Sequence, residues 1–111
     1  MVTSEQAGKD PVIKEFLSRI APLRNRIERI ILFGSRARGK AAPWSDYDLL
    51  IVVPERERDL VDRLYDAVVA VLCSTEKELS LKIFSREKFA ALSKIKTPFM
   101  KNIQMEGILL G

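Results

Sequence analysis

The spacing of apolar residues along the chain is helical in some segments and strand-like in others. The first segment with helical spacing begins at Asp10-Pro11. Asp10-Pro11 is typical of a helix start, with the aspartate as N-cap and the proline at the first helical position. Apolar residues then recur on one helical face, and Pro22 is expected to kink or divide this helix near Ala21. The segment before this helix is mostly polar, so we expect a flexible N-terminal tail over residues 1–9.

Three apolar segments have the length and composition of strands. Residues 27–33 end in an apolar run before Gly34, residues 47–53 are apolar on both faces after Asp48, and residues 79–84 alternate. A strand that is apolar on both faces is expected in the interior of a sheet. We therefore expect the second of these strands to be central.

Helical patterns separate and follow these strands. Residues 36–39 have the length of one helical turn, residues 58–72 repeat apolar residues on one face, and Ser85 and Thr97 are N-caps for two more helices. The order of elements predicts an α/β fold in which a small mixed sheet of about three core strands is flanked by helices. A single domain over residues 10–111 accommodates all of them.

Composition narrows the classes of protein and of metal site. No apolar run reaches the roughly 18 residues that a membrane span needs, and the N-terminus has no signal-peptide core, so we expect a cytoplasmic protein without membrane contact. The chain has no histidine and one cysteine, Cys73, which excludes an intramolecular disulfide and a Cys/His zinc site. A metal here would be held by oxygen ligands, as Mg²⁺ or Mn²⁺. We expect Cys73 to be a buried packing residue.

The net charge of +4 is compatible with nucleic-acid binding and is also ordinary for a soluble domain. The basic residues are spread along the chain and aromatic residues are few, so a base-stacking platform is not evident. We therefore expect a small phosphate-bearing ligand rather than a nucleic acid.

Gly34 and Ser35 directly follow the first expected strand. Glycine allows a tight turn and a close approach of a ligand to the backbone, and the amides at the start of a helix favour anions. The Ser35 hydroxyl, Arg36 and Arg38 would add hydrogen bonds and positive charge. Taken alone, this turn is only a weak indication of a phosphate site.

Asp46 and Asp48 lie two residues apart at the head of the second strand, so their side chains are expected on one face. Two carboxylates there repel each other, and a divalent cation between them would remove the repulsion. The alternative is that both are solvated loop residues, with Asp46 as a turn cap. Beside a phosphate-type turn, the metal site is the favoured interpretation.

The segments 32–39 and 45–53 together resemble the signature of the DNA polymerase β-like nucleotidyltransferase superfamily, and most closely its small prokaryotic branch, the minimal nucleotidyltransferases. The resemblance implies that the fold extends over nearly the whole chain. It also implies transfer of a nucleoside monophosphate, AMP from ATP, to an acceptor hydroxyl with release of pyrophosphate. Asp46 and Asp48 would then be catalytic and would bind Mg²⁺ or Mn²⁺. The implied nucleotide-binding residues are Gly34, Ser35, Arg36, Arg38 and Ser45.

Two parts of this comparison stay open. Arg38 would either steady the pyrophosphate or support the turn by pairing with Asp46 or with a carbonyl. The family also has a third carboxylate on the third strand, where this chain has Ser80, followed on the same face by Lys82. Glu78 would replace that carboxylate only if the strand began earlier or bent inward. The favoured interpretation is that Glu78 is a solvated residue at the strand edge. The alternative function is a catalytically weak or silent nucleotide- or partner-binding module.

The resemblance implies a partner as well. Minimal nucleotidyltransferases commonly pair with small helical HEPN-type proteins in toxin–antitoxin systems, and some adenylylate the toxin. Apolar residues within segments 98–105 and 108–110 would form a surface for that partner or for a second copy of the chain. Alternatively they cap the core, which is the favoured interpretation.

Overall fold

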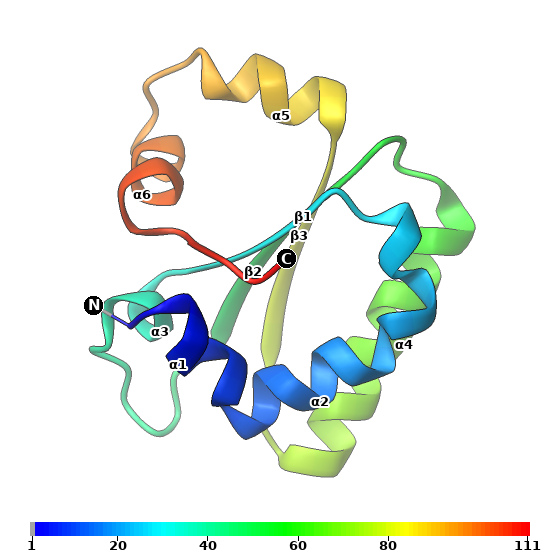
Figure 1. The fold of residues 1–111 in the computed structure, drawn as a ribbon, viewed down its shortest axis with the longest axis vertical. Coiled ribbons are helices and arrows are strands. Elements are labelled where there is room, and N and C mark those ends of the chain that lie inside the picture. The colour runs from blue at the N-terminus through cyan, green and yellow to red at the C-terminus, as the bar shows by residue number, and fades with distance from the viewer. Residues whose placement is uncertain (1) are drawn as a thin grey trace.

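The computed structural model of the protein describes residues 2–111, and its centre is one four-stranded sheet with helices on both faces (Figure 1). The strand order is β3-β2-β1-β4. β1 is antiparallel to β2 and to β4, and β2 is parallel to β3. The expected mixed α/β fold is confirmed, with a short fourth strand in addition. In chain order the elements are α1 (Ser4–Lys9), α2 (Pro11–Arg19), the 3₁₀ helix η1 (Ala21–Arg26), β1 (Arg29–Phe33), α3 (Ser35–Arg38), β2 (Tyr47–Val53), α4 (Arg58–Thr75), β3 (Leu79–Ser85), α5 (Arg86–Ser93), α6 (Pro98–Glu106) and β4 (Ile108–Leu109).

The central position expected for residues 47–53 is confirmed, because β2 lies between β1 and β3 and is almost entirely buried. Its register brings the ends of three strands together. Asp48 lies opposite Phe33 of β1 on one side and opposite Ser80 of β3 on the other. The chain leaves β1 and enters β2 and β3 at this same end of the sheet.

Helices cover the two faces of the sheet unequally. The α2 and α4 side holds the larger core, with Phe16, Ile20 and Leu64 fully buried. The opposite side, under α5 and α6, holds a smaller cluster around Leu50 and Ile103. Figure 1 shows α5 and α6 on one side of the sheet and α1, α2 and α4 on the other. No helix within residues 2–111 has the length and apolar character needed to cross a membrane.

The N-terminal segment corrects one expectation, because residues 4–9 form helix α1 rather than a flexible tail. Thr3 accepts a hydrogen bond from the Gln6 amide, and the Gln6 side chain accepts one from the Thr3 amide, which together form a capping box. Ala7 is buried in the main core, and the Val2 amide donates to the Ala37 carbonyl. The N-terminal segment therefore packs against the domain; Met1 lies outside the described residues.

Pro22 divides the first helix as expected. α2 ends at Arg19, and the chain continues as the 3₁₀ helix η1, which contains Pro22. The expectation that Cys73 is buried is wrong, because it lies on the exposed face of α4.

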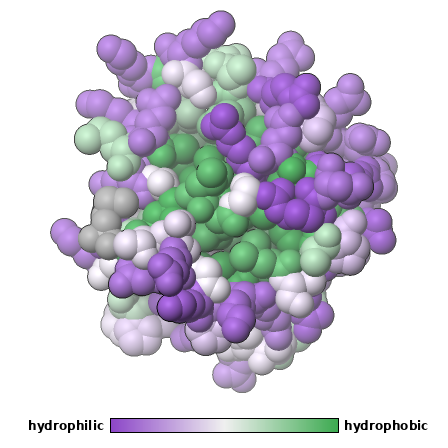
Figure 2. Space-filling view, viewed as in Figure 1, coloured by the Kyte–Doolittle hydropathy of each residue, from purple (hydrophilic) through white to green (hydrophobic). Residues whose placement is uncertain are grey.

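The C-terminal segment is mostly part of the core. Met100, Ile103 and Ile108 are buried, whereas Met105 and Leu109 are exposed. Figure 2 shows apolar surface gathered at the centre of the face on which β4 lies in Figure 1. The favoured interpretation, that this segment caps the core, therefore holds for its buried residues only.

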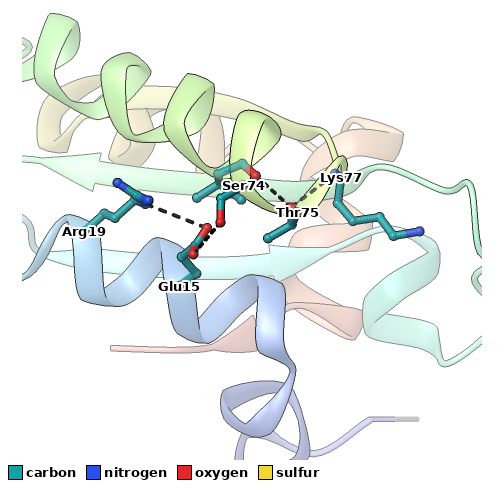
Figure 3. A network of polar contacts seen from close by, with 6 residues as sticks. Glu15, Arg19, Ser74, Thr75 and Lys77 are labelled. Atoms are coloured by element: carbon teal, nitrogen blue, oxygen red, sulfur yellow. Dashed lines mark hydrogen bonds and ion pairs between the residues drawn. The ribbon is translucent and has the colours of Figure 1, made fainter.

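A polar network fixes the end of α4 against α2 (Figure 3). The Ser74 hydroxyl donates to Glu15, which also pairs with Arg19. The Thr75 hydroxyl accepts the Lys77 amide at 3.1 Å, immediately after the helix ends. These contacts fix the turn of residues 76–78, which leads from α4 into β3, beside the end of the sheet.

Candidate functional site

Gly34 and Asp48 form the centre of the candidate site. Gly34 has φ = 76°, a backbone conformation that L-residues rarely adopt, and it is the N-cap of α3. The Asp48 carboxylate lies directly over its Cα, so a β-carbon at position 34 would overlap Oδ2 of Asp48. Glycine is therefore needed here both for the turn and for the approach of the carboxylate.

The start of α3, next to Gly34, leaves backbone donors uncapped. The amides of Ser35 and Arg36, in the first turn, have no acceptor within the helix, and no side chain from the described residues caps them. Gly34 accepts from the amides of Ala37 and Arg38 through its carbonyl, which holds the turn closed. The turn thus offers the donor arrangement expected for an anion.

Asp48 carries negative charge in an unfavourable place. Its pKa is raised, first by burial and then by the charge of Asp46, while the charges of Lys82 and Arg38 partly offset this. Asp46 is exposed in the loop directly before β2, and its charge acts on Asp48. Their oxygen donors suit a hard divalent cation, which would relieve the repulsion.

Few of the described carboxylates lie where they could bind a metal ion together with Asp46 and Asp48. Within residues 2–111 no group of three or more Asp, Glu, Cys or His side chains is placed to share a metal ion. In β3, Ser80 pairs directly with Asp48, and Lys82 is the next residue on that face. The Glu78 side chain is exposed just before the strand, and its carbonyl accepts the Tyr47 amide.

Arg36 contacts the loop that precedes Asp46. Its guanidinium donates to the Ser45 carbonyl at 2.8 Å and to the Pro43 carbonyl at 3.3 Å, and lies 4.2 Å from the centre of the Tyr47 ring. The Ser45 hydroxyl accepts the Ala42 amide. In this structure, Arg36 and Ser45 therefore hold the loop in shape.

Arg38 forms an ion pair with Glu106 of α6 at 3.1 Å. This partner differs from both that were considered from the sequence, Asp46 and a backbone carbonyl. Glu106 lies 68 residues away along the chain, and no local pattern indicates the pair. About a third of each side chain is exposed, so the guanidinium remains accessible from solvent.

A buried tyrosine between the two aspartates was missed by the sequence reasoning. The Tyr47 hydroxyl donates to Asp10 at 2.9 Å, and Asp10 also accepts the Val12 amide as N-cap of α2. Burial, and then the hydrogen bond to Asp10, raise the pKa of Tyr47 to about 12. This contact fixes the start of β2 to the start of α2, and so helps to position Asp46 and Asp48.

Residues 11–108 match the sequence profile of the nucleotidyltransferase domain. A Methanocaldococcus jannaschii protein that bears the name protein adenylyltransferase is 35% identical over 104 residues, which are 93% of this chain and 98% of that one. A second protein of that name from the same organism is 49% identical over 45 residues, 40% of this chain and 46% of the other.

Solved structures share the fold. A nucleotidyltransferase from Sulfolobus solfataricus superposes with a TM-score of 0.53 at 23% identity, over 88% of this chain and 75% of that one. A chain of a toxin–antitoxin structure with AMP-PNP superposes with a TM-score of 0.58 at 13% identity, over 88% and 71%. At these identities the likeness extends to the fold and no further.

Proposed function

Because this chain belongs to the nucleotidyltransferase domain family, we propose that it transfers AMP from ATP to a hydroxyl group of an acceptor protein and releases pyrophosphate. The observation that carries the proposal is the packing of the Asp48 carboxylate against Gly34, directly beside the uncapped start of α3. A carboxylate and an anion site so close together favour a ligand that carries both phosphate and a cation.

In this proposal the triphosphate binds at the β1–α3 turn. The amides of Ser35 and Arg36 and the Ser35 hydroxyl donate to phosphate oxygens. Arg38 supplies positive charge from the side of α6, while Glu106 orients its guanidinium. Arg36 and Ser45 act indirectly, because their contacts hold the loop that leads into Asp46.

Asp46 and Asp48 are the proposed ligands of Mg²⁺ or Mn²⁺. The fit rests on their oxygen donors and on the position of Asp48, whose pKa is raised first by burial and then by the charge of Asp46. When bound, such an ion would neutralise the charge on the phosphates and the departing pyrophosphate. Since no third carboxylate within residues 2–111 is placed to share the ion, the remaining coordination would fall to the nucleotide and to water.

The proposed reaction is an in-line displacement. A bond forms between the acceptor oxygen and the α-phosphorus, the bond from that phosphorus to the oxygen bridging to the β-phosphorus breaks, and pyrophosphate leaves with the electron pair. The proton of the acceptor hydroxyl passes to water. The opposing positions of α3 and β3 around Asp48 provide separate sides for the leaving group and the acceptor. Ser80 can orient the acceptor hydroxyl but is a poor base at neutral pH.

The proposed acceptor is a small helical partner of the HEPN type, as in a toxin–antitoxin pair. Support comes from the relative named as a protein adenylyltransferase over nearly the whole chain, and from the shared fold with a chain of a toxin–antitoxin structure.

A second candidate follows from β3. Ser80 pairs with Asp48 where the family has a carboxylate, and the charge of Lys82 acts on the same aspartate. These features favour a module that binds nucleotide and partner but turns over slowly or not at all.

Label transfer separates the two candidates. The protein is incubated with labelled ATP, Mg²⁺ and the product of a neighbouring small helical reading frame. Transfer that is lost in Asp46→Asn and Asp48→Asn supports the enzyme, whereas nucleotide binding without transfer supports the silent module. Absence of both binding and transfer contradicts both candidates.

A further inference from the structure

Trp44, the only tryptophan of the chain, lies two residues before Asp46 with 83% of its surface exposed. It lines an open pocket of about 400 Å³ that continues along Asp46 to the end of α4, where Leu72 is also exposed. Tryptophan is rare at such positions and is enriched where one protein binds another. An exposed indole beside the candidate metal site therefore requires a functional explanation.

Hydrogen bonds to the backbone on both sides of Trp44 hold the loop that carries the indole. On one side, Arg36 donates to the carbonyls of Pro43 and Ser45, which flank Trp44. On the other side, the Lys77 ammonium donates to the Pro43 carbonyl at 2.7 Å. Lys77 is itself placed by the network at the end of α4, from which its side chain extends away (Figure 3). A surface that is ordered in advance loses less conformational entropy when a partner binds.

The pocket also has a charge opposite to that of the chain. Asp46, Glu76 and Glu78 line it together with a single basic residue, Lys77, whose ammonium is already bound to the loop. The chain as a whole carries +4. The carboxylates of Glu76 and Glu78, which the proposed metal site does not use, would repel a phosphate and attract a cationic side chain. An arginine is suited to it, because a guanidinium stacks on an indole and pairs with carboxylates at the same time.

The position of the pocket favours binding of the acceptor over binding of the nucleotide. The phosphate turn follows β1, the aspartates lie at the head of β2, and the pocket extends past Asp46 toward the start of β3. In-line displacement requires the attacking oxygen on the side opposite the leaving pyrophosphate. The pocket is lined by residues that precede β2 and β3, whereas the phosphate turn follows β1, so an acceptor in the pocket would approach from the β3 side.

From these observations we infer that the Trp44 pocket binds the acceptor polypeptide through an arginine or lysine near its reactive hydroxyl, and so sets acceptor specificity. This inference rests on the proposed transferase function. In it Trp44 provides the stacking surface, and Glu76 and Glu78 select for positive charge. None of the three takes part in the reaction itself.

The test compares two short synthetic peptides with one central tyrosine, flanked by arginines in one and by glutamates in the other. Calorimetry in the presence of Mg-ATP measures the affinity of each peptide for the full chain. Wild type is expected to bind the arginine peptide at least about fivefold more tightly, since stacking and charge pairing each contribute modestly at exposed sites. The arginine peptide is also expected to shift the emission of Trp44.

The variants test each part of the inference. Trp44→Ala and Glu78→Lys are expected to lose the preference, and Trp44→Phe to retain part of it. Glu87→Lys, with the same charge change on an exposed residue of α5, is the matched control and is expected to keep the preference.

Equal affinity of wild type for the two peptides, or an unchanged preference in Trp44→Ala and Glu78→Lys, overturns this inference. Mg-ATP affinity is measured separately on the same samples. Normal Mg-ATP binding in those cases leaves the nucleotide site of the proposed function standing, so the two failures are distinguishable.

Discussion

Gly34 and Asp48 lie in direct contact across the first two strands, and the carboxylate of Asp48 occupies the space that a side chain at position 34 would need. The contact joins the proposed phosphate turn to the strand that carries a proposed metal ligand. A change at either residue should therefore affect both parts of the site.

Gly34→Ala is expected to lower the affinity for Mg-ATP about tenfold or more and to destabilise the fold by about 1–3 kcal/mol, because the β-carbon clashes and φ is strained. Calorimetry and urea unfolding measure the two effects. Gly8→Ala in α1 is the matched control: its β-carbon meets nothing within 4 Å, and helix propensity predicts a gain of about 0.5–1 kcal/mol. Wild-type binding by Gly34→Ala would contradict the assignment.

Asp48→Asn is expected to raise the melting temperature of the metal-free protein at neutral pH. The pKa of Asp48 is raised in the folded state, so folding favours its protonated form, and ionisation lowers stability as the pH rises through that pKa. The difference between variant and wild type should vanish below the ordinary aspartate pKa. Thermal unfolding across pH in a chelating buffer checks this. Equal stability of the two proteins at all pH values would show that the ionised Asp48 carboxylate does not destabilise the folded state.

Arg36→Lys is expected to loosen the loop before Asp46. A lysine cannot reproduce the guanidinium contacts to Ser45 and Pro43 or the stacking on Tyr47. Hydrogen exchange of the amides in residues 40–45 should accelerate, with a loss of about 1 kcal/mol in stability. Arg58→Lys, on an exposed arginine at the start of α4, is the control. If exchange in the loop is unchanged, Arg36 is not its anchor.

Ser80→Asp is expected to increase the rate of transfer, because it places a carboxylate beside Asp48 where the family has one. A base and metal ligand there contributes on the order of 10²-fold or more in rate. Ser80→Asn has a similar size without the charge and should leave the rate low. The measurement is initial rate with labelled ATP. A fall in rate for Ser80→Asp alone would mean that this register position is not the missing carboxylate site.

The three longer strands could be predicted from the sequence because their signals are local, whereas the roles of the site residues remain a prediction. Residues 47–53 are apolar on both faces, which indicates a central strand, and β2 is central. Counting alternate residues placed Ser80 on the face of Lys82, and the register then pairs Ser80 with Asp48. The capping box of Thr3 and Gln6 was an equally local signal, and α1 could have been predicted from it.

The roles of the arginines were not predictable in this way, because their partners are set by the tertiary fold. Arg38 pairs with Glu106 across 68 positions, and Arg36 binds backbone carbonyls that carry no sequence signal. The hydrogen bond from Tyr47 to Asp10 likewise depends on how α2 packs on the sheet. β4 has only two residues, and its pairing with β1 is what defines it as a strand.

The β1–α3 turn and the aspartate pair are proposed to form one coupled site for phosphate and metal. The most direct measurement is the affinity for ATP by calorimetry, with Mg²⁺ and with a chelator, for wild type and Asp48→Asn. We expect wild type to bind ATP at least about tenfold more tightly with Mg²⁺ than with a chelator, and Asp48→Asn to lose this dependence. Equal ATP affinity with and without Mg²⁺ in wild type would contradict the proposal.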